Sequence, residues 1–140
     1  MKYKAICYLS NIKPSLNKGE IDDLMDFSVH QNNKRAITGL CILLDNHFYQ
    51  ILEGEPNAVD ELFSKIKKDN RHNGLIKLID KPIKDKIFAE YYGGDFAIVK
   101  KRVDVNKLKI YLEWLKNANI PEINELLLLT ENFLKYNNGL

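Results

Sequence analysis

The pattern of apolar residues predicts an α+β fold, in which a ferredoxin-like βαββαββ sheet carries two helices on one face. Several short segments place apolar residues at every second position, as strands do, and two longer segments place them at helical spacing. The 140 residues are enough for one hydrophobic core and too few for two full domains. Strands and helices in this order fold as a sheet with both helices packed on the same face.

The first strand is predicted over residues 3–9, with Tyr8 facing the helices. A loop leads to Asn17, which has a glutamate three residues later and so resembles a helix N-cap with its reciprocal partner. The helix is therefore predicted over residues 19–32. Asn32 lies almost three whole turns beyond the start of the apolar stripe and should end it facing inward. The stripe consists of Ile21, Leu24, Met25 and Ser28.

Two strands follow, over residues 37–44 and 47–53, joined by an Asp-Asn pair that tolerates the left-handed backbone of a tight hairpin. A proline suited to the first turn opens a second helix over residues 56–69. A fourth strand is predicted over residues 74–82 and a fifth over residues 88–99, where a Gly-Gly pair suggests a bulge. The stripe of the second helix consists of Val59, Leu62, Phe63 and Ile66.

The remaining chain predicts a helical extension, residues 101–140, added to a domain of residues 1–100. Its two helices are available to cover the second face of the sheet, which the first two helices leave open. The leucine run at residues 126–129 is too wide for one narrow seam, so it serves core packing, a dimer surface, or both. The residues of the open face that need burial are Tyr3, Ala5, Cys7, Tyr49 and Ile51.

Composition excludes several classes of protein. The net charge is only +2 and the lysines are dispersed, which argues against a nucleic-acid surface. No apolar run approaches about 18 residues and no cleavable leader is visible, so neither a membrane span nor export is expected. Cys7 and Cys41 lie in apolar strands and are expected to be reduced in a cytoplasmic protein. The three histidines lack metal-ligand spacing, and no catalytic constellation indicates an enzyme.

Gln50 is the most informative residue, because its strand position shares a face with large apolar side chains. Burying an unpaired amide costs about 1 to 3 kcal/mol, so a partner is expected, and Tyr8 is the candidate. Together with Ser28 and Asn32, these side chains should point into the layer between helices and sheet. Neutral donors and acceptors of this kind suit a planar heterocyclic cofactor. The alternative is a satisfied core glutamine or a surface residue of an edge strand.

These residues resemble the BLUF family, blue-light sensors that bind FAD, over about residues 3–99. The Phe-Tyr-Gln-Ile-Leu-Glu-Gly-Glu segment at residues 48–55 is the most specific part of the resemblance. The other parts are Tyr8 with Ser10, Asn32 ahead of Ile37-Thr38-Gly39-Leu40, and Asp69-Asn70-Arg71-His72.

The resemblance implies that FAD lies between the two sheet-packed helices. Asn32 would bond the polar edge of the ring, Gln50 would sit between the ring and Tyr8, and Leu24 and Ile66 would sandwich the ring. Lys65 stands where the family usually has arginine, which keeps the charge and loses the planar fork. The remaining expected contacts are Ser28 and Phe48 beside the ring, and Asp69, Arg71 and His72 toward the ribityl chain and the mouth of the pocket.

The resemblance also implies a hydrogen-bond switch. Light would move an electron and a proton from Tyr8 toward the flavin, and Gln50 would tautomerise or rotate before they return, which shifts the absorption to the red. The chain resembles short family members whose C-terminal helices signal by self-association or by contact with a downstream protein. The predicted partners are therefore FAD, a second copy and an unidentified protein.

Three alternatives stay open at this point. Tyr91-Tyr92-Gly93 replaces the Trp-x-Met common in the family, so a flavin-binding or empty interaction module without a working photocycle is the main competitor, and Tyr91 is a possible second electron donor. An acylphosphatase-like enzyme is disfavoured because the loop after the first strand has no arginine. An RNA-binding sheet is disfavoured because exposed aromatic pairs are missing from the central strands.

Overall fold

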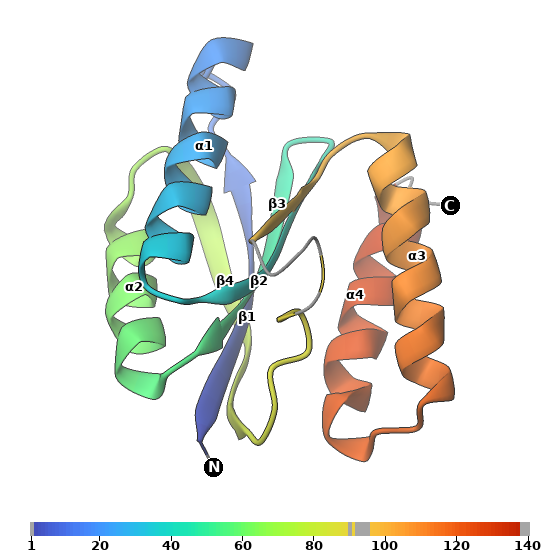
Figure 1. Ribbon diagram of the computed structural model, residues 1–140. Helices are drawn as coiled ribbons and strands as arrows, with labels where there is room; N and C mark the ends of the chain where they lie inside the picture. Colours follow the sequence, from blue (N-terminus) through green and yellow to red (C-terminus); the bar gives the residue numbers. More distant parts are fainter. Residues whose placement is uncertain (1, 90, 92–95, 138–140) are drawn as a thin grey trace.

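The computed structural model describes residues 2–89, 91 and 96–137 and has the predicted α+β architecture. Figure 1 shows one sheet between two pairs of helices. In chain order the elements are β1 (Tyr3–Ile12), α1 (Lys18–Lys34), β2 (Thr38–Leu44), β3 (His47–Gly54), α2 (Pro56–Lys68), β4 (His72–Ile83), β5 (Ala97–Val99), α3 (Arg102–Asn117), the short 3-10 helix η2 (Pro121–Ile123) and α4 (Asn124–Tyr136).

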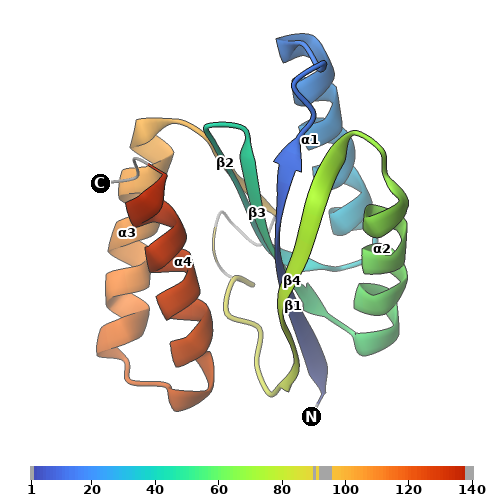
Figure 2. The ribbon, with the colours of Figure 1, turned by 180° about the vertical axis from the view of Figure 1, so that it is seen from behind.

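The strands lie in the order β4-β1-β3-β2-β5, with β3 at the centre. The first four pair antiparallel, and β5 pairs parallel to β2. Helices α1 and α2 cover one face, and α3 and α4 cover the other, as Figures 1 and 2 show from opposite sides. This arrangement confirms the predicted ferredoxin-like sheet and the predicted cover by the C-terminal helices.

Local signals work as expected at two of the predicted boundaries. Asn17 caps α1, and its side chain and that of Glu20 each bond the backbone N–H of the other residue. Asp45 and Asn46 have φ values of 51° and 64°, which gives the β2–β3 hairpin its left-handed turn. Gly39 has a φ of 138°, and a Cβ atom there would come within 2.0 Å of the carbonyl oxygen of Ile51, so only glycine fits.

The fifth strand does not begin at residue 88 as predicted. Among the described residues of that segment, only Ala97–Val99 pairs with β2, and residues 84–89 are irregular. The buried carboxylate of Glu53 accepts hydrogen bonds from the backbone N–H groups of Ile87 and Phe88, at 2.7 and 2.6 Å. These two groups therefore do not donate to a neighbouring strand. The predicted bulge at Gly93-Gly94 lies outside the described residues.

The two sheet faces bury separate cores. Under α3 and α4, the phenol of Tyr49 bonds Thr130 at 2.6 Å and its ring stacks on Phe133 at 4.9 Å. The leucine run packs chiefly into this core through Leu126 and Leu127. Among the described residues, no helix is both long and apolar enough to cross a membrane. The second core lies under α1 and α2 and holds the polar groups considered next.

Candidate functional site

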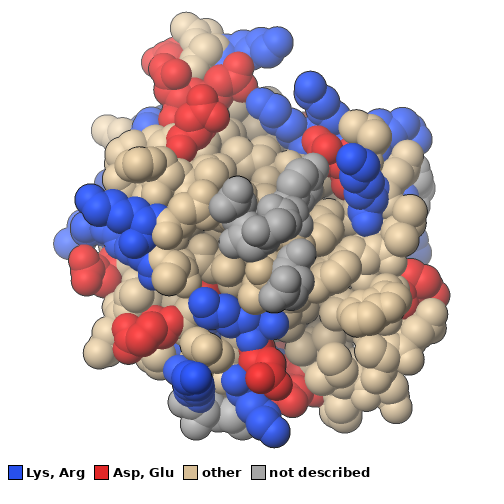
Figure 3. Space-filling model, in the orientation of Figure 1, with Lys and Arg blue, Asp and Glu red and all other residues tan. Residues whose placement is uncertain are grey.

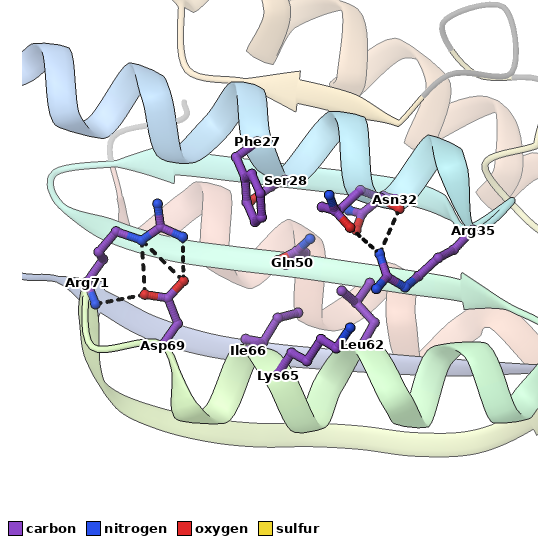
Figure 4. A pocket seen from close by; sticks show the side chains of 11 residues that line it. Phe27, Ser28, Asn32, Arg35, Gln50, Leu62, Lys65, Ile66, Asp69 and Arg71 are labelled. Atoms are coloured by element: carbon purple, nitrogen blue, oxygen red, sulfur yellow. Dashed lines mark hydrogen bonds and ion pairs between the residues drawn. The ribbon is translucent and has the colours of Figure 1, made fainter.

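A cavity of about 150 Å³ opens between α1 and α2 over the central strands (Figure 4). A smaller pocket of about 30 Å³ continues it toward Tyr8 and His72. The two share Ser28, Gln50 and Ile66 on their walls and therefore form one groove. The predicted site residues all line this groove, which are Tyr8, Leu24, Ser28, Asn32, Phe48, Gln50, Lys65, Ile66, Asp69, Arg71 and His72.

Tyr8 and Gln50 meet because β1 and β3 pair antiparallel. They are direct partners in the strand register, so their side chains leave the sheet on the same face. The phenol of Tyr8 donates a hydrogen bond to Oε1 of Gln50, and both residues are buried. Burial raises the pKa of Tyr8 well above its ordinary range, so the phenol is neutral and holds its proton against the amide oxygen.

Asn32 carries an unsatisfied donor into the cavity. The residue is 1% exposed, and its Nδ2 atom has no hydrogen-bond partner among the described residues. A buried amide left in this way costs about 1 to 3 kcal/mol, which a ligand with a carbonyl oxygen would recover. The site therefore fits a flat ligand whose edge carries hydrogen-bond acceptors.

The helices supply the apolar walls of the groove. Leu24 comes from α1 and Ile66 from α2, and Phe48 lies beneath them on β3. The hydroxyl of Ser28 also lines the groove, but it donates its hydrogen to the carbonyl of Leu24 at 2.9 Å. Ser28 can therefore only accept a hydrogen bond from a ligand.

His72 lies inside the groove beside Tyr8, with ring centroids 6.4 Å apart. Its Nε2 atom is 2.8 Å from the carbonyl oxygen of Ile66, and its Nδ1 atom is 2.8 Å from the hydroxyl of Ser10. A carbonyl can only accept, so Nε2 carries a hydrogen, and the hydroxyl of Ser10, which can donate or accept, is the partner of Nδ1. Both ring nitrogens are thus occupied, and His72 acts as a fixed wall.

Asp69 and Arg71 form a closed pair at one end of the cavity. The guanidinium donates to both carboxylate oxygens, with Nη2 2.6 Å from Oδ2 and Nε 3.0 Å from Oδ1. These bonds hold the pKa of Asp69 below its usual range. The guanidinium also lies 5.6 Å from the ring centroid of Phe27. The charges at this end are therefore mutually compensated.

Two polar residues of the cavity were missed in the sequence, Gln31 and Arg35. Nη1 of Arg35 donates to Oε1 of Gln31 at 2.6 Å, and both side chains border the cavity. Figure 4 shows Arg35 near Asn32 at one end of the cavity. The four-residue spacing of Gln31 and Arg35 places them on one helix side, which was the available signal. Lys65 on the facing helix is mostly exposed and pairs with Glu61 at 3.7 Å. Phe27 and Leu62 are the apolar wall residues that were also missed.

Charge and metal chemistry do not mark a second site. Figure 3 shows basic and acidic side chains interspersed on one face, without a continuous basic stripe. No group of three or more histidine, cysteine, aspartate or glutamate residues in the described part of the chain is arranged to hold a metal ion.

Fold and site together define a small α+β domain with a groove, between two helices on a sheet, that fits a flat ligand. The chain belongs to the BLUF family, sensors of blue-light using FAD, whose family model matches residues 4–93. The class of ligand that the groove fits is therefore a flavin.

Solved structures agree with this assignment. The dark-state structure of the BLUF protein BlrB superposes with a TM-score of 0.67 and 28% identity, covering 90% of this chain and 92% of that chain. A bacterial light-regulated adenylyl cyclase superposes with a TM-score of 0.64 and 28% identity, covering 83% of this chain and 34% of that chain.

One curated relative matches this chain over only a small part of its own length. The photoactivated adenylate cyclase subunit alpha of Euglena gracilis is 25% identical over 84 residues, which are 60% of this chain and 8% of that protein. The chain thus spans a small fraction of this much longer relative.

Proposed function

We propose that the chain is a blue-light photoreceptor that holds FAD between α1 and α2 and uses Tyr8 and Gln50 as its switch. The observation that carries the proposal is the hydrogen bond from the buried Tyr8 phenol to Gln50, in the same groove as the unpaired amide of Asn32. In this reading the chain is a photosensory module rather than an enzyme.

The residues of the groove fit the ring of a flavin. Asn32 would donate through Nδ2 to a ring carbonyl, and Arg35 lies close enough along the same helix side to supply a second donor. Leu24 and Ile66 would cover the two ring faces. The bound flavin would supply absorption of blue light and accept an electron. The Asp69–Arg71 pair would border the ribityl chain.

Two side chains of the protein would make up the proposed switch. Tyr8 is the phenol within the groove that can give up an electron, and its proton already has an acceptor in Oε1 of Gln50. When electron and proton return to Tyr8, a Gln50 side chain that has tautomerised or rotated presents a different hydrogen-bonding edge. In a buried site one altered hydrogen bond changes the energy of a nearby chromophore measurably, and the expected result is a red shift.

Absorption spectra of the FAD-loaded protein in darkness and after blue light test the proposal. We expect a small reversible red shift in the wild type, and retained flavin without the shift in Gln50→Leu and Tyr8→Phe. Normal photocycling of either variant would refute the assigned switch. A yellow wild type without a shift would leave an interaction module with a degenerate photocycle, and failure to bind FAD would exclude both readings.

The output is proposed to be self-association or contact with a downstream protein, made through the C-terminal helices. Val103, Ile110 and Trp114 support this, because all three are exposed apolar side chains of α3. Their spacings of seven and four residues place them on one side of the helix. The buried thiols of Cys7 and Cys41 form no disulfide bond, which supports a reducing compartment, and we propose the cytoplasm.

A further inference from the structure

Helix α1 is attached to strand β5 at both ends of that strand. Near the C-terminal end of α1, Oδ1 of Asn33 accepts a hydrogen bond from the backbone N–H of Phe96, at 3.0 Å. Near its N-terminal end, Asp22 forms an ion pair with Lys100 at 2.9 Å. Phe96 and Lys100 directly flank Ala97–Val99. The two contacts therefore tie the strand to the helix that forms one wall of the groove.

Strand β5 is also the last element before the C-terminal helices. Within the described part of the chain it pairs only with β2, over three residues, at the edge of the sheet. Its end at Val99 is followed closely by α3, which starts at Arg102 on the opposite face of the sheet. A strand held by so few ladder bonds has little resistance to a shift of the helix attached to it.

Two neighbouring residues of α1, Asn32 and Asn33, contact the groove and β5, respectively. Asn32 lines the cavity with its unpaired amide, and Asn33 bonds the backbone that begins β5. A change in the hydrogen bonds that a ligand makes with Asn32 acts on the same backbone segment that carries Asn33. No side chain of residues 91–93 is needed for this connection.

We propose that Asn33 is a positioning residue that transmits the lit state of the groove through β5 to α3. This inference rests on the proposed light-sensing function, because the lit and dark ligand must interact differently with α1 to shift the helices. The side chain makes no contribution to the groove itself. Its removal should therefore separate the spectral change from the structural response.

Trp114 offers a direct measurement of that response. It is the only tryptophan of the chain and lies on α3 with 65% of its surface exposed. In the 15N-labelled, FAD-loaded full chain it gives one indole N–H resonance, which can be followed in darkness and under blue light. Absorption spectra of the same samples report the flavin independently.

We expect the wild-type indole resonance to differ between the two states. Asn33→Ala should keep the red shift of the flavin and reduce the light-minus-dark change of Trp114 by about 2-fold or more, as expected for one coupling side chain. Asn33→Asp should restore the change, because a carboxylate also accepts from the N–H of Phe96. Asn57→Ala, at an exposed position in the first turn of α2, is the matched control and should behave as wild type.

An undiminished Trp114 change in Asn33→Ala would overturn the inference, as would a red-shifting wild type whose Trp114 stays unchanged. Absence of the red shift in the wild type would instead refute the proposed function. Asp22→Asn, which weakens the second attachment, provides an independent variant if Asn33→Ala does not fold. A response lost in Glu53→Gln but kept in both α1 variants would assign the route to β3 and also overturn the inference.

Discussion

At the residue scale, the polar groups of the groove were predictable because strand periodicity fixes which side chains share a face. Strand periodicity predicts that Tyr8 and Gln50 face the same layer, and the register of β1 and β3 makes them direct partners. The spacing along α1 likewise placed Asn32 inward. Arg35 escaped because it is the C-cap of α1, just beyond the stripe that helical periodicity describes.

Replacing Asn32 should separate stability from binding. In Asn32→Ala the ligand-free protein loses a buried donor that has no partner, so its melting temperature should stay the same or rise. The same change removes one bond to a flavin carbonyl and should weaken FAD binding about 2- to 10-fold, measured by fluorescence titration. Asn57→Ala is the control, because this exposed residue of α2 does not line the groove, and its affinity for FAD should change little. Equal losses in both variants would contradict the assignment.

At the element scale, the start of the fifth strand depends on a tertiary contact that a local sequence pattern cannot predict. The strand is predicted to begin at Phe88, yet Glu53, more than 30 residues earlier in the chain, accepts the backbone N–H groups of Ile87 and Phe88. Such a competition depends on tertiary contacts and leaves no local signal. The C-terminal helices were predictable for the opposite reason, since an apolar sheet face has to be covered.

Glu53 should give the stability of the protein a distinctive pH dependence. Burial raises the pKa of this carboxyl above its ordinary value, although bonds from Thr38, Ile87 and Phe88 oppose the shift. The folded state therefore binds the proton more tightly than the unfolded state, and stability from this group falls as the pH rises from about 4.5 through the folded pKa. Urea unfolding across pH 4 to 8 should show that the unfolding free energy of the wild type, minus that of Glu53→Gln, falls with rising pH. A rise of this quantity with pH would refute the assignment.

The docking of α4 should depend on the hydroxyl of Tyr49. Thr130 donates its own hydrogen to the carbonyl of Leu126, so the phenol of Tyr49 is the donor in their shared bond. Tyr49→Phe removes that bond at a buried position and should cost about 0.5 to 1.5 kcal/mol in unfolding free energy. Amide exchange in α4 should accelerate. Trp114→Phe, on the exposed side of α3, should leave α4 exchange unchanged, and an equal effect of both changes would contradict this account.

At the scale of the whole molecule, the second apolar side of α3 has no cover among the described residues. Ordinary surface helices have one apolar stripe, whereas α3 buries Leu108 and Leu112 and still exposes Val103, Ile110 and Trp114. The sequence could predict that the C-terminal helices cover the sheet. It could not show which side of them stays exposed, because that depends on how α3 is rotated against the core.

Ile110→Lys should therefore change association and leave the fold intact. The side chain is exposed, so the unfolding free energy should change by no more than about 0.5 kcal/mol. Sedimentation velocity in darkness and under blue light should show a light-dependent change in mass for the wild type and a loss of that change in the variant. Asn57→Lys, which also introduces a lysine but at an exposed position of α2, serves as the control. A variant that associates like the wild type would show that α3 is not the contact surface.

The central position of β3 has one more consequence. Seven of its eight residues are buried, and it is hydrogen-bonded on both edges and packed on both faces. Its amide protons should consequently exchange with deuterium only when the whole domain opens, which makes this strand the slowest-exchanging segment of the chain. In the proposed switch, the amide of Gln50 would thus be carried by the most rigid backbone of the domain. Illumination would then act by changing the surroundings of β3, while the strand itself keeps its shape.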